Sequence, residues 1–259
     1  MNTTSNFLQN ALLHPFQDKN WGTKLLIGGA LLLASMLIPV IPALFVLGYL
    51  YRIQRRVIID KSGPQLPEWE DWGQLLQDGL KYLGAILVYM LPALLLMIGG
   101  YVFMMFSPML ITMVAEVGEV GEKAASVLGI LLLLGFMGGV LAMLLGSVLG
   151  IAIGILVPAG LAHMSAQDRF GAAFEINVWI KNWRANAGGY VLAFVVVMGL
   201  SWALTFILSF TYFAAIFCCL LPAVAISYVS YYLGVVSANL YANAYINGQT
   251  EAGLPEVEA

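Results

Sequence analysis

Four long stretches without a charged residue constrain this chain more than any other feature. Residues 25–51, 82–115, 124–167 and 185–250 contain no Asp, Glu, Lys or Arg. A helix needs about 20 apolar residues to cross the hydrocarbon core of a bilayer, so the last stretch accommodates two crossings. The apolar runs do not alternate with polar residues, as the strands of a membrane β-barrel would. We therefore predict an all-α fold, a polytopic transmembrane helical bundle.

The composition agrees with this fold class. Hydrophobic residues make up 61% of the chain and charged residues 10%, whereas soluble domains carry about 25% charged residues. The net charge of −3 offers no basic surface for nucleic acid, so the lipid bilayer is the first expected partner. The adjacent Cys218 and Cys219 lie in an apolar run and are interpreted as small buried residues, because a disulfide between neighbours is strained.

The basic residues predict the orientation in the membrane. Short cytoplasmic loops are enriched in Lys and Arg, and placing residues 52–81 and 168–184 inside leaves Lys123 as the one basic residue outside. This predicts a multi-pass protein of the inner (cytoplasmic) membrane with both termini in the cytoplasm. A transmembrane domain, 21–250, then follows an N-terminal interfacial segment, 1–20, and precedes a C-terminal tail, 251–259. Its six expected segments are 21–38, 40–59, 82–106, 124–163, 187–210 and 213–246.

The first charge-free stretch allows two interpretations. Basic residues on both sides of it favour the same side of the membrane, and Pro39 and Pro42 interrupt it in the middle. We favour a short hairpin of two segments. The alternative is one kinked crossing, which gives five segments in all.

The order of features recurs along the chain. Ile41-Pro42-Ala43 precedes Arg52 and the pair Trp69 and Trp72, and Val157-Pro158-Ala159 precedes Arg169 and the pair Trp179 and Trp183. Each set leads into a spanning run, which predicts an internal repeat with both copies running in the same direction. The alternative is coincidence, because interfacial tryptophans recur in any membrane protein.

The segment 63–80 is the most distinctive part of the sequence. Read as a helix after Pro67, it places Trp69 and Trp72 on one side and turns Glu70, Asp71 and Asp78 toward water or the nearby arginines. Tryptophan rings prefer the headgroup boundary. We expect this elbow to lie there and to steer the chain into the next span.

Three motifs resemble a known family. They are Gly48-Tyr49 with the basic extension Arg52-Ile53-Gln54-Arg55-Arg56, the sequence Pro67-Glu68-Trp69-x-Asp71-Trp72, and Asp78-Gly79-Leu80-Lys81. Together they resemble an uncharacterised family of bacterial and archaeal polytopic membrane proteins, catalogued as a domain of unknown function. That family is distantly similar to the membrane domain attached to some glycerophosphodiester phosphodiesterases. The resemblance implies the fold and supplies no catalytic residue.

Small residues recur in steps of four within the third charge-free stretch, at Gly138, Ala142, Gly146, Gly150 and Gly154. Such a stripe forms a groove along a helix that lets another backbone approach closely. The partner is either a helix of the same chain or one of another subunit.

Further residues are candidates for contacts with headgroups or partners. Asn239, Asn243 and Asn247 also recur in steps of four. The face that they form is either a solvated helix end or a contact face for a headgroup or partner. The arginines of residues 52–56 are a topological anchor, a site for anionic headgroups, or partners of the nearby acids. The full set of contact residues is Arg52, Arg55, Arg56, Glu68, Trp69, Asp71, Trp72, Trp179, Trp183, Asn239 and Asn243.

The predicted function follows from what the spans lack. A charge at mid-bilayer costs about 2.5–3.5 kcal/mol and usually serves ion coupling or proton relay, and no predicted spanning core holds one. Glu116, Glu119 and Glu122 offer few oxygens for a metal, and His163 has no ligand neighbours, so no metal or cofactor is expected.

We therefore expect a non-enzymatic membrane scaffold or accessory subunit that packs against other membrane proteins, a second copy of itself or lipids. The alternative is a channel or facilitator for a small neutral solute or lipid, motivated by the Gly- and Pro-interrupted spans. A lipid enzyme is a third possibility, and its carboxylates would be Asp71, Asp78 and Asp168.

Overall fold

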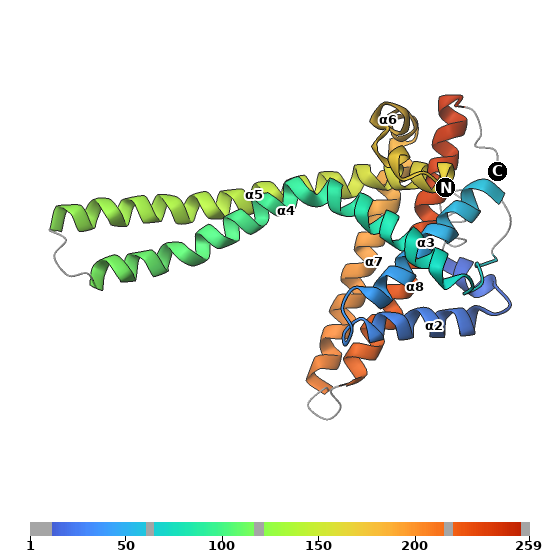
Figure 1. Ribbon diagram of the computed structural model, residues 1–259, viewed down its shortest axis with the longest axis horizontal. Coiled ribbons are helices and arrows are strands. Elements are labelled where there is room, and N and C mark those ends of the chain that lie inside the picture. Colours follow the sequence, from blue (N-terminus) through green and yellow to red (C-terminus); the bar gives the residue numbers. More distant parts are fainter. Residues whose placement is uncertain (1–11, 61–64, 117–121, 215–219, 255–259) are drawn as a thin grey trace. The chain divides into compact units, whose positions relative to one another are not determined.

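The computed structural model describes residues 12–60, 65–116, 122–214 and 220–254, and within these ranges the ordered elements are helices (Figure 1). In chain order they are η1 (His14–Gln17), α2 (Trp21–Ala34), α3 (Ile41–Asp60), α4 (Trp72–Glu116), α5 (Glu122–Gln167), η2 (Phe170–Phe174), α6 (Ile176–Ala185), α7 (Ala187–Ala214) and α8 (Leu220–Ala252). The predicted all-α class is confirmed. Cys218, Cys219 and Glu119 lie outside the described residues.

Four of these helices are long and apolar enough to cross a membrane, which indicates a membrane protein. The candidate spans are Trp72–Leu110, Ser126–Gln167, Ala187–Ser209 and Pro222–Ala252. Helix α2 is apolar but has 14 residues, about 21 Å, against a hydrocarbon core of about 30 Å. Helix α3 has 20 residues and carries three arginines in its second half. The expected total of six segments therefore stays a prediction.

Left-handed backbone marks three helix boundaries. Val40 has a φ of 76° between α2 and α3, Asp71 a φ of 52° before α4, and Asp168 a φ of 49° after α5. Aspartate is one of the few side chains that tolerate this region. Helix α8 ends at Ala252 and is followed by the left-handed Gly253. Leu254 N–H donates to Gln249 C=O and Gly253 N–H to Thr250 C=O, as in a Schellman motif.

The chain divides into two compact units, and the first comprises Met1–Ile86 and Ile155–Ala259. Helix α8 lies at its centre and packs against α2, α3, α6 and α7. Small residues allow the close approach of α2, since a side chain at Gly28 would overlap the ring of Tyr231 and one at Gly29 the ring of Tyr228. These helices are therefore held together by glycine contacts as well as by apolar burial.

Helix α3 and the first turns of α4 touch through their backbones within the first unit. A Cβ atom at Gly48 would overlap the carbonyl oxygen of Leu75, and one at Gly79 would overlap that of Leu44. A backbone carbonyl cannot move aside as a side chain can. Both positions therefore require glycine, and this crossing fixes the start of α4.

The second unit, Leu87–Gly154, is formed by the later part of α4 and the first part of α5. The two helices meet at Gly100 and Gly139, where a Cβ on either would lie within 2.8 Å of the other's carbonyl oxygen. Gly146 packs against Ala93 and Met97, whereas Gly138 has no neighbour within 4 Å. At Gly146, the predicted small-residue stripe thus faces α4 of the same chain.

The two Pro-Ala sequences of the predicted repeat occupy different places. Ile41-Pro42-Ala43 begins α3, whereas Val157-Pro158-Ala159 lies inside α5. Prolines within α4 and α5 are tolerated because neighbouring groups in a membrane protein can satisfy the freed carbonyls. The repeat stays a prediction.

Candidate functional site: a buried lysine beside the first elbow

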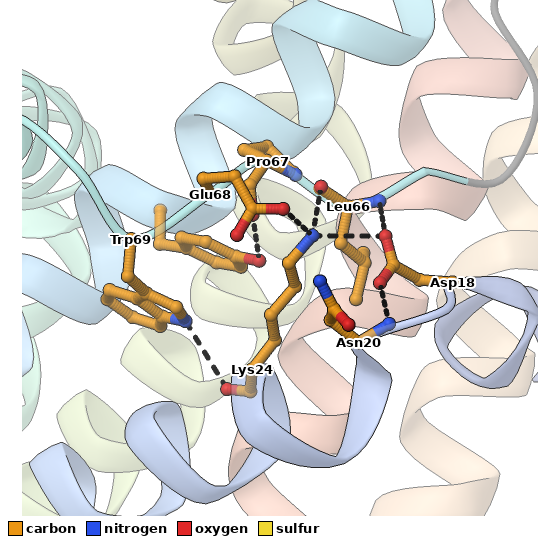
Figure 2. Close-up of polar contacts among 8 residues, drawn as sticks. Asp18, Asn20, Lys24, Leu66, Pro67, Glu68 and Trp69 are labelled. Carbon is orange, nitrogen blue, oxygen red and sulfur yellow. Dashed lines mark hydrogen bonds and ion pairs between the residues drawn. The ribbon is translucent and has the colours of Figure 1, made fainter.

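Residues 65–71, which join α3 to α4 and are called the first elbow below, enclose the buried Lys24 of α2 (Figure 2). Lys24 Nζ lies 2.7 Å from Glu68 Oε1 and 3.0 Å from Asp18 Oδ2. It also donates to the carbonyl oxygen of Leu66 at 2.7 Å. An ammonium group has three donors, so each of them has one acceptor and the charge is compensated.

Asp18 is buried, and its carboxylate accepts hydrogen bonds from three groups. Its oxygens accept from Lys24 and from the backbone N–H groups of Asn20 at 2.7 Å and Leu66 at 2.9 Å. Burial raises the pKa of Asp18, but these hydrogen bonds and the Lys24 charge outweigh burial and hold the pKa below its usual value. The aspartate is therefore ionised and ties the chain before α2 to the first elbow.

Trp69 anchors the same elbow through an indole hydrogen bond and two ring contacts. Its Nε1 donates to the carbonyl oxygen of Lys24 at 3.3 Å. The ring stacks on Tyr49 at a centroid distance of 4.0 Å and contacts Trp72 at 5.8 Å, while the Tyr49 hydroxyl donates to the carbonyl of Pro67. Trp69 is 9% exposed and Trp72 44% exposed, so only Trp72 of the pair presents much of its ring to the surroundings.

A cavity of about 370 Å³ opens beside this cluster. It is lined by Asn20, Thr23 and Lys24 at the start of α2 and by Glu68, Trp69 and Glu70 of the first elbow. Since Asp18 already balances Lys24, Glu68 and Glu70 give the cavity an excess of negative charge. The side chain of Glu68 is 57% exposed, so its carboxylate is accessible from the surroundings.

The arginines predicted as contact residues are paired within the chain. Asp78, which is buried, lies 3.4 Å from Arg52 Nε and 3.5 Å from Lys81 Nζ. Asp168 lies 2.8 Å from Arg55 and accepts a hydrogen bond from the hydroxyl of Tyr51. Lys81 also approaches Asp168, Arg56 pairs with Asp60, and Arg52 donates to the carbonyls of Glu70 and Asp71. This network joins α3, α4 and the end of α5.

Residues 168–186, called the second elbow below, join α5 to α7 and carry a different polar cluster. Buried His163 has Nδ1 2.8 Å from the Tyr245 hydroxyl and Nε2 3.4 Å from Glu175 Oε2. Arg169 donates to the other oxygen of Glu175 at 2.9 Å. Hydrogen bonds with His163 and Arg169 lower the pKa of Glu175 below its usual value.

Neutral amides complete the second elbow. Asn182 donates to the carbonyl of Tyr245 at 2.9 Å and accepts from the Tyr190 hydroxyl at 2.8 Å. Asn186 donates to the carbonyl of Ala244 at 2.9 Å. In the predicted tryptophan pair, Trp179 Nε1 donates to the carbonyl of Ala173 and Trp183 Nε1 to that of Ile155. Both tryptophans therefore hold the chain's own backbone.

The asparagine face of α8 turns partly inward. Asn239 is buried, and Asn243 donates to its side-chain oxygen at 2.6 Å and its carbonyl at 2.9 Å. Asn247 is exposed. The first two asparagines thus bond along their own helix.

Lys24, Asp18, Asn182 and Asn186 are not among the site residues predicted from the sequence. A lysine followed directly by an apolar run, with an aspartate six residues before it, is the one signal that points to the first two. Within the described ranges, no group of three or more His, Cys, Asp or Glu residues is arranged to hold a metal ion.

These features define a class: an α-helical protein with four candidate membrane spans, fastened at the ends of the spans by buried polar clusters. The chain belongs to the family described as proteins of unknown function, DUF4013, whose sequence model matches residues 31–213. No curated protein and no solved structure matches the chain. The expected membership of a family of unknown function is confirmed, while the similarity to the phosphodiesterase membrane domain stays a prediction.

Proposed function

We propose that this protein is a non-enzymatic integral membrane scaffold or accessory subunit that packs against other membrane proteins. The observation that carries this proposal is the outward face of the second unit. Large apolar side chains there are exposed, among them Leu95 at 63%, Leu141 at 57% and Val148 at 65%. The inner faces of the same helices are closed by glycine contacts, so the outer faces are the surfaces left for a partner or for lipid.

The polar groups of the first unit support a structural role. Lys24, Asp78, Asp168 and His163 each have at least one partner within the chain. Paired groups of this kind rigidify the ends of helices. Helix association in lipid depends on close packing and hydrogen bonds rather than on the hydrophobic effect, so a pre-formed rigid surface favours binding.

The topology that goes with this function has six membrane segments. In it, α2 and α3 form a short hairpin and α4, α5, α7 and α8 supply the crossings, with both termini in the cytoplasm. The basic residues of α3 and the second elbow then lie on the inner side, as the positive-inside rule requires. The two elbows would be equivalent positions of an internal repeat.

Photocrosslinking tests the scaffold role. A photoreactive residue at Leu141 or Val148 is expected to form adducts with another membrane protein or a second copy of the chain. The same residue at Val235, which is buried in the first unit, serves as the matched control and forms none. Lipid adducts alone at both exposed positions, with a monomer that retains no protein in mild detergent, would overturn the proposal.

A facilitator for a small neutral solute or lipid is the second candidate, favoured by a groove between α7 and α8. The groove has a volume of about 260 Å³ and is lined by Ser201, Thr205 and Ser230 among apolar residues. Both helices are candidate spans. Reconstituted vesicles should then take up glycerol faster than protein-free vesicles, and the isosteric Thr205→Val should slow this uptake. Equal rates in all three would remove the candidate.

A further inference from the structure

Among the described residues, the lining of the cavity at the first elbow and its direct partner Asp18 carry three carboxylates, Asp18, Glu68 and Glu70, against the one ammonium of Lys24. All three donors of Lys24 are used by Asp18, Glu68 and Leu66. Asp18 is saturated by its backbone partners and by Lys24, whereas Glu68 is more than half exposed. Glu70 lines the cavity as well, and within the described ranges no ion pair involves its carboxylate. This excess of negative charge favours a cationic ligand.

The place of the cavity along the chain indicates where such a cation would come from. Glu68, Trp69 and Glu70 lie two to four residues before Trp72, the first residue of a candidate span. The end of a span lies at the level of the lipid headgroups. A cationic group fixed to a lipid is thus present at high local concentration at this depth.

The lining discriminates between kinds of cation. The cavity residues do not provide a cluster of three acidic, histidine or cysteine ligands within the described part of the chain, and hard metal ions require more converging oxygens. A quaternary ammonium is recognised by open aromatic faces, but Trp69 has its ring covered by Tyr49 and Trp72. The described cavity lining therefore lacks the ligands that a metal ion requires and the open aromatic face that a quaternary ammonium requires.

A primary ammonium group fits the groups that remain. It donates three hydrogen bonds, and Glu68, Glu70 and Thr23, three of the residues that line the cavity, have side chains that can accept them. We infer that this cavity binds the primary ammonium of a phosphatidylethanolamine-type headgroup, with Glu68 and Glu70 as its counter-ions. The inference rests on the proposed membrane placement of the first elbow and not on any protein partner.

Lipid retention tests the assignment. The full chain is placed in nanodiscs of equal parts phosphatidylethanolamine, its mono- and dimethylated forms, phosphatidylcholine and the anionic phosphatidylglycerol. It is then taken back into detergent, and the retained lipid is measured by mass spectrometry. The wild type is expected to enrich phosphatidylethanolamine, and its mono- and dimethylated forms are retained progressively less. Glu70→Gln should lower the enrichment about two- to fivefold, the factor for loss of an exposed ion pair.

Glu251→Gln is the matched control, because Glu251 is an exposed glutamate at the end of α8, outside the cavity lining. Equal retention of every headgroup, preferential retention of anionic lipid, or the same result for Glu70→Gln and Glu251→Gln would overturn the inference. Soluble phosphoethanolamine forms a separate arm. Competition by it supports recognition of the ammonium group, whereas binding of it without any lipid selectivity overturns the lipid assignment.

The result of the lipid-retention experiment is independent of the result of the photocrosslinking experiment. Headgroup selectivity can fail while Leu141 and Val148 still form protein adducts, and selectivity can hold in a monomer that binds no protein. The thermal unfolding temperature of Glu70→Gln is measured alongside. An unchanged temperature assigns the lost enrichment to the binding site rather than to unfolding.

Discussion

The first elbow and the second elbow both precede a candidate span, and both insert a tryptophan whose indole N–H donates to a backbone carbonyl, at Trp69 and Trp179. Their remaining chemistry differs. The first elbow is closed around the ammonium of Lys24 by two carboxylates. The second is held chiefly by the neutral amides of Asn182 and Asn186. The stability of an elbow held by charged groups changes with pH and falls when any one partner is removed. The stability of an elbow held by amides depends mainly on the geometry of the hydrogen bonds.

Removal of the buried cation should give the largest effect. Lys24→Met leaves Asp18 buried without its counter-ion, and loss of one partner of a buried pair destabilises by about 3–5 kcal/mol. Thermal unfolding in detergent measures the change. The double variant Lys24→Met, Asp18→Asn should recover part of it, because the uncompensated charge is gone. A single variant within about 0.5 kcal/mol of wild type would show that the charge does not hold the first elbow.

A methyl group at the α3–α4 crossing should disturb the first turns of α4, which follow the first elbow directly. In Gly48→Ala the new Cβ meets the carbonyl of Leu75, and overpacking costs about 1–3 kcal/mol. Gly73→Ala is the control, because nothing lies within 4 Å of a Cβ there, and its unfolding temperature should be unchanged or slightly higher. Equal temperatures for the two variants would contradict the backbone contact.

The amide cluster should show a smaller loss that is independent of acid. Asn182→Ala leaves the Tyr190 hydroxyl and the Tyr245 carbonyl without their partner, which costs about 1–3 kcal/mol. The loss of unfolding temperature should be the same at pH 5 and pH 7, because asparagine does not titrate. A loss that changes between these two values would mean that the second elbow is held by His163 and Glu175 instead.

The smallest effects are expected at low pH. The pKa values of Asp18 and Glu175 are lowered in the folded state, so their stabilisation is present above the unfolded pKa of each group and is lost as the pH falls through the folded value. The unfolding temperature of wild type should therefore fall between pH 5 and pH 3. Asp18→Asn should flatten this fall more than Glu175→Gln, because Glu175 is partly exposed. If Glu175→Gln flattened the fall more than Asp18→Asn, the second elbow, and not the first, would be the one whose stability depends more on charge.

Sequence patterns predicted the helical class well because it depends on local composition. Runs without charge are visible one residue at a time. The last three of them correspond to α4, α5, α7 and α8, whereas the first lies on the shorter helices α2 and α3. The polar site was less predictable, since Lys24 and Leu66 lie 42 residues apart and meet only through the packing of α2, α3 and α8. The pairing of Glu68 with Lys24, with no ion pair to the arginines among the described residues, depended on the same packing.

The glycine stripe illustrates a second limit. A step of four residues predicts a face, but helices have 3.6 residues per turn, so a strict step of four drifts around the axis. Gly139 and Gly146, seven residues apart, both meet α4, whereas Gly138 has no neighbour within 4 Å. Which of two adjacent glycines makes the contact depends on the crossing of the partner helix, which a single sequence does not contain.

The length of α4 has a consequence for the membranes in which this protein can reside. Its charge-free stretch, residues 82–115, is about 50 Å long as a helix, against a hydrocarbon core of about 30 Å. A stretch with such a surplus is accommodated by tilting or kinking, and Pro92 and Pro108 supply two points for a kink. A protein whose apolar helix length matches the thickness of only one kind of membrane is retained in that membrane, because a mismatch elsewhere costs free energy. This helix keeps apolar residues in contact with lipid when the bilayer thins or thickens by several ångströms.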